Sequence, residues 1–160
     1  MAGLLLEAGG GSKRLQIMVA PDAVAARLAQ EVDIVLLGAD RITSTGDVSN
    51  KIGSLTVALG AAHGKNVQVV VASDVDKIVA PGQDHGPTER HPASEITAAW
   101  PEHARQALGD KITVFGEWFE WVPSNLIDVY ISDEGVLDRE KVAEFGKHIA
   151  LMQQQIFKGT

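Results

Sequence analysis

Four polar side chains lie close together in this sequence and could act on one small molecule: Asp40, Arg41, Asn50 and Lys51. A carboxylate can accept and return a proton, while two cations and an amide can hold a negatively charged group. Asp40 follows an aliphatic run that ends at Gly38, and Asn50 and Lys51 stand just before a new apolar segment. The combination suggests a small anionic ligand on which a proton is moved.

Each of these residues also has an ordinary structural interpretation. Asp40 is placed where an aspartate often caps a turn or a helix, and Asn50 could cap a helix beside a solvated Lys51. Gly46 and Gly53 would let the backbone approach a ligand closely. The loop matches neither the Walker pattern nor the dinucleotide-binding glycine pattern. The ligand interpretation therefore depends on where the fold places these residues.

The elements around these residues are expected to alternate between strand and helix. The aliphatic residues 32–37 predict a parallel strand covered on both faces, and residues 38–49, rich in Gly, Ser, Thr and Asp, predict a loop. A helix is predicted over residues 50–63, with Gly64 as its C-cap. This helix would place Asn50 and Lys51 at its N-terminus, where free N–H groups and the helix dipole attract anions.

The rest of the chain continues the alternation. Further strands are predicted at residues 15–20, 67–72 and 129–132, and further helices at residues 21–30 and 138–157, the last capped by Asp138. Residues 74–94 predict a long loop of the kind that is usually functional or mobile. Residues 94–100 and the segment after Pro123 predict short helices, and residues 115–121 predict an extended segment. The order predicts an α/β fold with a right-handed parallel sheet flanked by helices, in which Asp40 lies at the ligand-binding edge.

Composition narrows the function classes. The chain has 160 residues, 45% of them apolar, and a formal charge of −7, which fits one globular domain over residues 1–160 and argues against broad binding to nucleic acid or anionic membranes. No apolar run approaches the roughly 20 residues that span a bilayer, so a cytoplasmic location is expected. The sequence has no cysteine, which excludes disulfides, thiolate metal sites and a cysteine nucleophile. The five histidines are scattered, so neither a metal nor another cofactor is expected.

An aromatic cluster follows the long loop and consists of Trp118, Phe119 and Trp121. It is interpreted as core or as an association surface. A platform for nucleic-acid bases is disfavoured because Glu117 and Glu120 would repel the phosphates.

Two motifs carry a resemblance to a known family. Residues 38–42 (Gly-Ala-Asp-Arg-Ile) and 46–53 (Gly-Asp-Val-Ser-Asn-Lys-Ile-Gly) resemble the signature shared by methylthioribose-1-phosphate isomerases, ribose-1,5-bisphosphate isomerases and the α, β and δ subunits of eukaryotic translation initiation factor 2B. Residues 89–100 and 121–137 also agree, so the resemblance extends over residues 15–142. It implies a Rossmann-like, three-layer α/β/α domain, truncated at the N-terminus, that pairs with a second copy or with related subunits.

The resemblance also implies roles for individual residues. Asp40 matches an aspartate that transfers a proton while an aldose phosphate becomes a ketose, and Asn50 and Lys51 match residues that contact the substrate. Gly38, Arg41 and Gly53 belong to the same motif and are expected to line the substrate site. The isomerases also use a catalytic cysteine upstream of the motif, whereas this chain has none.

Two functions follow as expectations. The first is a domain that binds a sugar phosphate or a related anion such as a nucleotide, with aldose–ketose isomerisation as ancestral chemistry that is incomplete in this chain. The alternative is a non-catalytic regulatory domain of the initiation factor 2B type, which acts through protein contacts. Retention of Asp40 favours the first because many initiation-factor subunits replace it, and the missing cysteine favours the second. An unrelated nucleotide-binding α/β domain has no matching loop.

Overall fold

The main sheet of the protein is built from three parallel strands and one antiparallel strand. In the computed structural model, which describes residues 2–9, 15–83, 86, 89–107 and 112–157, this sheet has the order β1-β4-β6-β7. Strands β1 (Ile34–Leu37), β4 (Gln68–Ala72) and β6 (Val129–Ser132) are parallel, and β7 (Gly135–Leu137) pairs antiparallel with β6. The aliphatic runs predicted the three parallel strands to within two residues.

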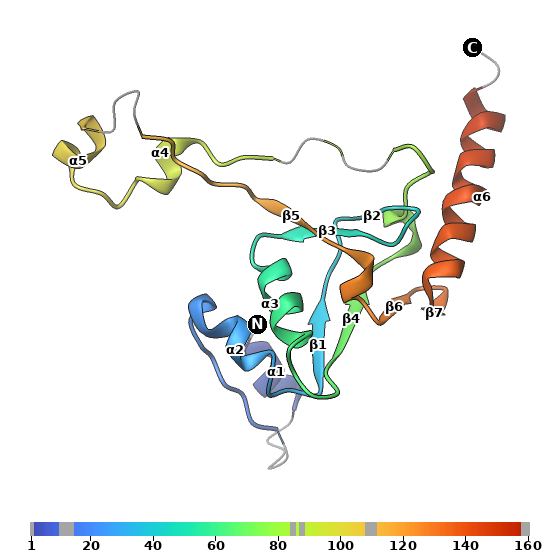
Figure 1. The fold of residues 1–160 in the computed structure, drawn as a ribbon, viewed down its shortest axis with the longest axis horizontal. Coiled ribbons are helices and arrows are strands. Elements are labelled where there is room, and N and C mark those ends of the chain that lie inside the picture. Colours follow the sequence, from blue (N-terminus) through green and yellow to red (C-terminus); the bar gives the residue numbers. More distant parts are fainter. Residues whose placement is uncertain (1, 10–14, 84–85, 87–88, 108–111, 158–160) are drawn as a thin grey trace.

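A second, smaller sheet lies beyond the end of β1 (Figure 1). It is antiparallel, has the order β2-β3-β5, and consists of β2 (Arg41–Ile42), β3 (Val48–Lys51) and β5 (Phe119–Val122). The predicted loop at residues 38–49 is therefore largely a β-hairpin. The predicted extended segment at residues 115–121 forms β5 in its second half.

Helices flank the sheets, which confirms the α/β class. They are α1 (Ala2–Ala8), η1 (Asp22–Val24), α2 (Ala25–Leu28), α3 (Ser54–Ala61), η2 (Val75–Lys77), α4 (Ala93–Ile96), α5 (Glu102–Gln106), η3 (Ser124–Leu126) and α6 (Arg139–Phe157). Asp138 caps α6 as predicted, because its carboxylate accepts a hydrogen bond of 2.9 Å from the Lys141 N–H. No helix in the described part of the chain has the length and apolar character needed to cross a membrane.

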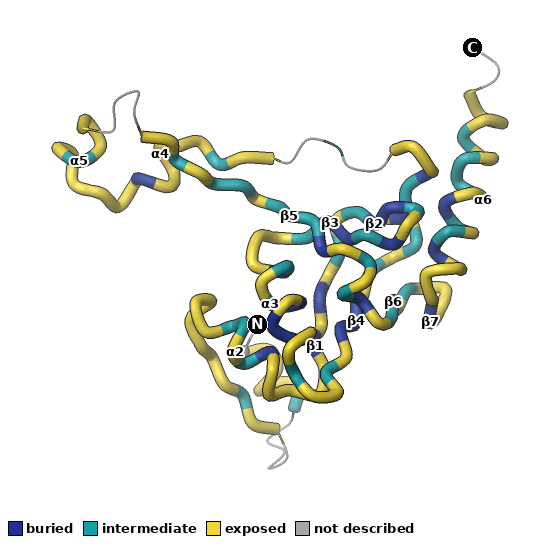
Figure 2. The backbone as a smooth tube through the Cα atoms, in the orientation of Figure 1, coloured by how far each residue is buried: buried dark blue, intermediate teal, exposed yellow. Residues whose placement is uncertain are grey.

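The core lies on one side of the main sheet. Val35 and Leu37 of β1 are buried in it, and Val71, Tyr130 and Val142 join them from β4, β6 and α6. Figure 2 shows buried segments along the strands of this sheet. The alternate residues of β1 are solvent-exposed, Ile34 by 56% and Leu36 by 67%. The expectation that β1 is covered on both faces is therefore wrong for the described part of the chain.

Three further expectations about local structure differ from the fold. Residues 15–20 form no strand, and Met18 and Val19 are 73% and 81% exposed, because an apolar run becomes a strand only where a neighbouring strand accepts its hydrogen bonds. Helix α3 begins at Ser54 and ends at Ala61, so Gly64 does not cap it. The loop at residues 74–94 contains η2, and its residues 84, 85, 87 and 88 lie outside the described part.

A narrow arm extends from the small sheet. Figure 1 shows residues 89–107 and 112–118 reaching away from both sheets, with α4 and α5 at the far end. An ion pair of 3.2 Å joins Arg90 to Glu117 across the arm, and the His91 ring stacks on Trp118 with 4.1 Å between the ring centroids. The predicted helix at residues 94–100 is the shorter α4.

Candidate functional site

The β2–β3 hairpin carries most of the residues singled out in the sequence. It starts directly after β1, and the Asp40 N–H closes its open end by donating a 2.8 Å hydrogen bond to the Ser49 carbonyl. Asp40 is solvent-exposed at this end. The predicted position of Asp40 beyond the carboxyl end of a parallel strand is thus the observed one.

Asn50 and Lys51 lie on a strand and do not begin a helix. They are the last two residues of β3 and pair with Glu120 and Phe119 of β5, whereas α3 begins at Ser54. The apolar spacing after residue 52 predicted the helix, but the partner strand is far away in the sequence and no local pattern reveals it. The predicted position at a helix N-terminus is therefore wrong for both residues.

The strand geometry divides the hairpin residues between two faces. Side chains alternate along a strand, so Arg41, Ser49 and Lys51 share the outer face with Phe119 and Trp121 of β5. The Lys51 ammonium lies 3.7 Å from the centre of the Phe119 ring and 5.3 Å from that of Trp118. We call Arg41, Lys51, Phe119 and Trp121 the outer ledge.

Asn50 is on the opposite face and faces the body of the protein. Its side-chain amide donates a 3.0 Å hydrogen bond to the Ser54 hydroxyl, which in turn donates one of 2.8 Å to the Lys51 carbonyl. A side chain on Gly38 would place its first carbon 3.9 Å from the Asn50 amide oxygen, so these two predicted residues are neighbours. One N–H of the Asn50 amide is therefore already used to join β3 to α3.

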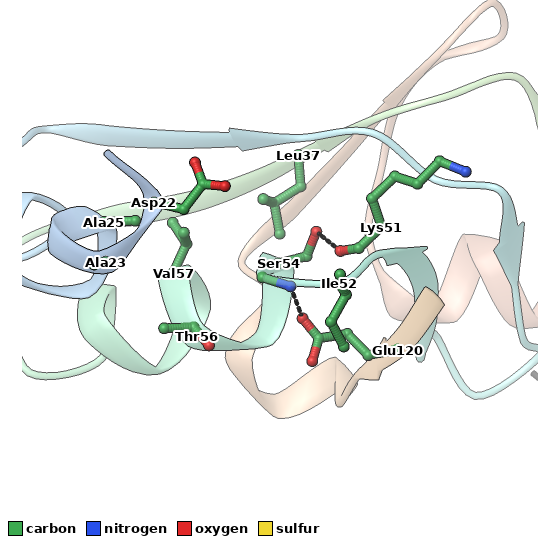
Figure 3. A pocket seen from close by; sticks show the side chains of 11 residues that line it. Asp22, Ala23, Ala25, Leu37, Lys51, Ile52, Ser54, Thr56, Val57 and Glu120 are labelled. Carbon is green, nitrogen blue, oxygen red and sulfur yellow. Dashed lines mark hydrogen bonds between the residues drawn. The ribbon is translucent and has the colours of Figure 1, made fainter. Parts of the chain in front are cut away.

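The N-terminus of α3 is occupied by a carboxylate of the protein itself. The Glu120 carboxylate accepts hydrogen bonds of 2.5 Å from the Gly53 N–H and 2.9 Å from the Leu55 N–H. Figure 3 shows Glu120 beside the start of the helix. Gly53 has a φ of 103°, which lets the chain turn from β3 into the helix. Two of the N–H groups at this helix end, where a ligand anion was expected, are thus bonded to Glu120.

Two hollows open next to the hairpin. One has a volume of about 550 Å³ and is lined by Lys51, Gly53, Ser54, Val57, Asp22, Glu120 and their neighbours (Figure 3). The other has about 250 Å³ and is lined by Asp40, Arg41, Ser49, Gly86, Glu89, Phe119 and Trp121. The structure therefore brings Asp40 and Arg41 together in one hollow and Lys51 and Gly53 together in the other.

Buried polar contacts hold the closed end of the hairpin. The Tyr130 hydroxyl donates a 2.5 Å hydrogen bond to the Gly46 carbonyl, and the Asp47 carboxylate accepts one of 2.8 Å from the Ser124 N–H. Burial raises the pKa of Tyr130 well above its ordinary value; the positive Arg139 opposes this rise and the negative Asp47 adds to it. The turn is therefore joined to both β6 and η3.

Several lining residues had not been singled out as site residues in the sequence. Ser49, Glu89 and Gly86 line the hollow of Asp40, and the acidic Glu120 had been considered only as a neighbour of the aromatic cluster. The cluster itself was interpreted as core or an association surface, yet Phe119 and Trp121 line a hollow. The pairing of β3 with β5 brings Phe119, Glu120 and Trp121 to the hairpin, whereas Gly86 and Glu89 come from the segment at residues 74–94. Among the described residues, no three Asp, Glu or His side chains are grouped so that they could hold a metal ion.

Comparisons with known proteins agree with the motif. A model described as the initiation factor 2 subunit family matches residues 12–139. A methylthioribose-1-phosphate isomerase from Pseudomonas fluorescens is 34% identical over 140 residues, which are 85% of this chain and 38% of that protein. One from Alkalilimnicola ehrlichii is 37% identical over 122 residues, or 72% of this chain and 31% of that protein.

Solved structures show the same fold. A 5-methylthioribose 1-phosphate isomerase from Pyrococcus horikoshii has a TM-score of 0.64 at 24% identity over 86% of this chain and 38% of its own. The delta subunit of translation initiation factor eIF-2B from A. fulgidus has a TM-score of 0.66 at 25% identity over 90% of this chain and 42% of its own. This chain thus spans about two fifths or less of each of these relatives. On the extent of the family match and the identity to the curated relatives, the chain belongs to the initiation factor 2 subunit family.

Proposed function

We propose that the β2–β3 hairpin binds a small sugar phosphate, with the phosphate on the outer ledge and Asp40 beside the sugar. One observation carries the proposal: Arg41 and Lys51 are diagonal neighbours on one face of an antiparallel sheet, where such residues lie about 7–8 Å apart. Two cations at this spacing can contact one phosphate group from two sides. The relatives support the sugar, since the curated ones are named as isomerases of methylthioribose 1-phosphate.

Asp40 is the proposed acid–base group. Conversion of an aldose to a ketose moves a proton between adjacent carbons, and a positioned carboxylate contributes roughly 10²–10⁴-fold to such a step. Asp40 is exposed in the hollow that also holds Arg41, so a sugar bound there can reach its carboxylate. Because the chain has no cysteine, the thiol that the resemblance implies would have to come from outside this chain.

The remaining motif residues are proposed to shape the site. Gly38 leaves room beside Asn50, and Gly53 provides the turn into α3. Asn50 lies on the face opposite the outer ledge, and its side-chain amide, bonded to the Ser54 hydroxyl, holds the end of β3 against the start of α3. These three residues set the course of the backbone and the packing of β3 on α3. Arg41 and Lys51 supply the positive charge that the phosphate needs.

A binding experiment tests the proposal. Thermal shift and calorimetric titrations would use methylthioribose 1-phosphate and ribose 5-phosphate on the full chain. A ligand at about 100 times its Kd adds about 2.7 kcal/mol of stability, so saturation gives a clear shift. We expect Lys51→Ala to weaken binding about tenfold or more, as is usual for a lost charged hydrogen bond, whereas Lys65→Ala, at another exposed lysine, leaves it unchanged. No shift with any sugar phosphate would overturn the proposal.

The missing thiol favours a second candidate, a non-catalytic regulatory domain that acts through protein contacts. Exposed apolar side chains on the open face of the main sheet, among them Leu36 and Val136, fit a contact with a second copy or a related subunit. An isomerisation assay with wild type and Asp40→Asn separates the two functions. Turnover that Asp40→Asn abolishes supports the enzyme, whereas ligand binding without turnover, together with a dimer in analytical ultracentrifugation, supports the regulatory domain.

A further inference from the structure

We propose that Glu120 closes the N-terminus of α3 to ligand anions and so directs the phosphate of a bound ligand to the outer ledge. The second half of this inference rests on the proposed function, because it concerns the same ligand. The first half concerns the protein alone. Glu120 is then a specificity-determining residue of the site, even though it lies outside the sequence motif.

The hydrogen bonds of Glu120 occupy two of the donors that an anion at this helix end would use. A helix begins with four N–H groups that have no partner inside the helix. At α3, the Glu120 carboxylate already accepts from the N–H groups of Gly53 and Leu55, at 2.5 and 2.9 Å. A phosphate at this place would have to remove the carboxylate and take over both bonds.

The position of Glu120 is fixed by the strand that carries it. Glu120 pairs with Asn50 across β3 and β5, and Val122, two residues along β5, is completely buried. The side chain is itself partly buried between the small sheet and α3. Because the backbone on both sides is anchored, the carboxylate remains close to the helix N-terminus.

The charges around the hairpin favour the outer ledge for an anion. The hollow at α3 is lined by two carboxylates, those of Asp22 and Glu120, and by one cation, Lys51. The Lys51 side chain points away from Glu120 (Figure 3), and its ammonium lies over the Phe119 ring on the ledge. A second anion beside Glu120 would be repelled, whereas the ledge offers Arg41 and Lys51 together.

A phosphate titration followed by ¹H–¹⁵N correlation spectra of the full chain tests the inference. Inorganic phosphate is expected to leave the amide signals of Gly53 and Leu55 unchanged in the wild type. In Glu120→Ala the same signals are expected to shift and saturate, with phosphate bound at least about tenfold more tightly at this place, as one charge-assisted contact would give. Glu120→Gln keeps an oxygen acceptor but removes the charge, and should give a smaller gain.

The control variant is Glu117→Ala, which removes an equal charge from the base of the arm, where Glu117 pairs with Arg90. It is expected to leave Gly53 and Leu55 insensitive to phosphate. Circular dichroism would check the fold of each variant, and Glu120→Gln decides alone if Glu120→Ala does not fold.

The outcomes separate this inference from the proposed function. Phosphate-dependent shifts of Gly53 and Leu55 in the wild type, or no gain in a folded Glu120 variant, would overturn the role of Glu120 even if sugar phosphates bind. If sugar phosphates do not bind the wild type but Glu120→Ala gains phosphate at α3, the proposed ligand is wrong and Glu120 still closes the helix. Sugar phosphates that shift the amides of Arg41 and Lys51 and not those of Gly53 and Leu55 support both.

Discussion

The two ends of strand β3 are held in very different ways. At the turn, Val48 is completely buried, and the Gly46 carbonyl is bonded to the hydroxyl of the buried Tyr130. At the other end Lys51 and Gly53 are exposed, and the backbone is held to the neighbour strand by exposed contacts, among them the bond of 3.0 Å from the Ile52 N–H to the Trp118 carbonyl and the bond from the Gly53 N–H to the Glu120 carboxylate. One end is thus part of the core and the other faces the hollows.

Because of this difference, we expect residues at the two ends of the hairpin to serve two purposes: those at the turn stabilise the fold, and those at the open end bind the ligand. Substitutions at the turn should lower the free energy of unfolding, because they leave cavities, clashes or unpaired buried groups. Substitutions at the open end should change ligand binding more than stability. The proposed site therefore lies on a rigid support and keeps its charged residues accessible.

The largest effect is expected from Gly46→Ala, with Gly53→Ala as its matched control. Both glycines have positive φ, 90° and 103°, but a side chain on Gly46 would meet the Tyr130 hydroxyl at 2.7 Å, whereas one on Gly53 would meet nothing within 4 Å. We expect a loss of about 2–4 kcal/mol at Gly46, from strain plus overpacking, and about 1 kcal/mol at Gly53, from strain alone. Urea unfolding measures both, and equal losses would remove the distinction between the two ends.

The next effect is expected from Tyr130→Phe. This change leaves the buried Gly46 carbonyl without its partner and should cost about 1–2 kcal/mol of unfolding free energy. Ser132→Ala removes another hydroxyl from the same strand, where the bond to the Gly135 carbonyl is exposed and 3.2 Å long, and should cost about 0.5 kcal/mol or less. Similar losses from the two variants would show that the turn is not anchored through Tyr130.

The same tyrosine gives the turn a dependence on alkaline pH. Burial raises the pKa of Tyr130 in the folded protein above its unfolded value of about 10, so between these two pKa values the folded state holds a proton that the unfolded state has lost. Tyr130 therefore leaves stability unchanged below about pH 10 and lowers it as the pH rises beyond that. Urea midpoints from pH 8 to 11 should fall less steeply in Tyr130→Phe, and because Tyr130 is the sole tyrosine the difference reports on it alone.

The smallest effect is expected from Lys51→Met. The contact of the ammonium with the Phe119 ring is exposed and should be worth about 0.5–1 kcal/mol, part of which the apolar methionine retains. The free energy of unfolding should therefore change by about 0.5 kcal/mol or less, while sugar-phosphate binding weakens as much as in Lys51→Ala. A loss of about 2 kcal/mol would make Lys51 a structural residue and place the open end in the same class as the turn.

Several parts of the fold were predicted from the sequence for a clear physical reason. In strands β4 and β6 and helix α6, the spacing of apolar residues matches the side chains that become buried. Asp138 caps α6 through a hydrogen bond to a residue three positions along the chain, so this contact could also be predicted from the sequence. The place of Asp40 followed from the aliphatic run before it. Residues 15–20 have a similar apolar character but no strand beside them, and there the prediction was wrong.

By itself, the sequence determined the α/β class, the family motif and the residue types at the candidate site, because these depend on local periodicity and on the order of residues. The tertiary structure alone decided that Asn50 and Lys51 lie on a strand, that Asp40 and Lys51 line separate hollows, and that Glu120 occupies the start of α3. All three depend on the pairing of β3 with β5, which are joined by a long stretch of chain. Hydrogen bonds between such distant strands form only once the chain has folded, and so no local pattern carries them.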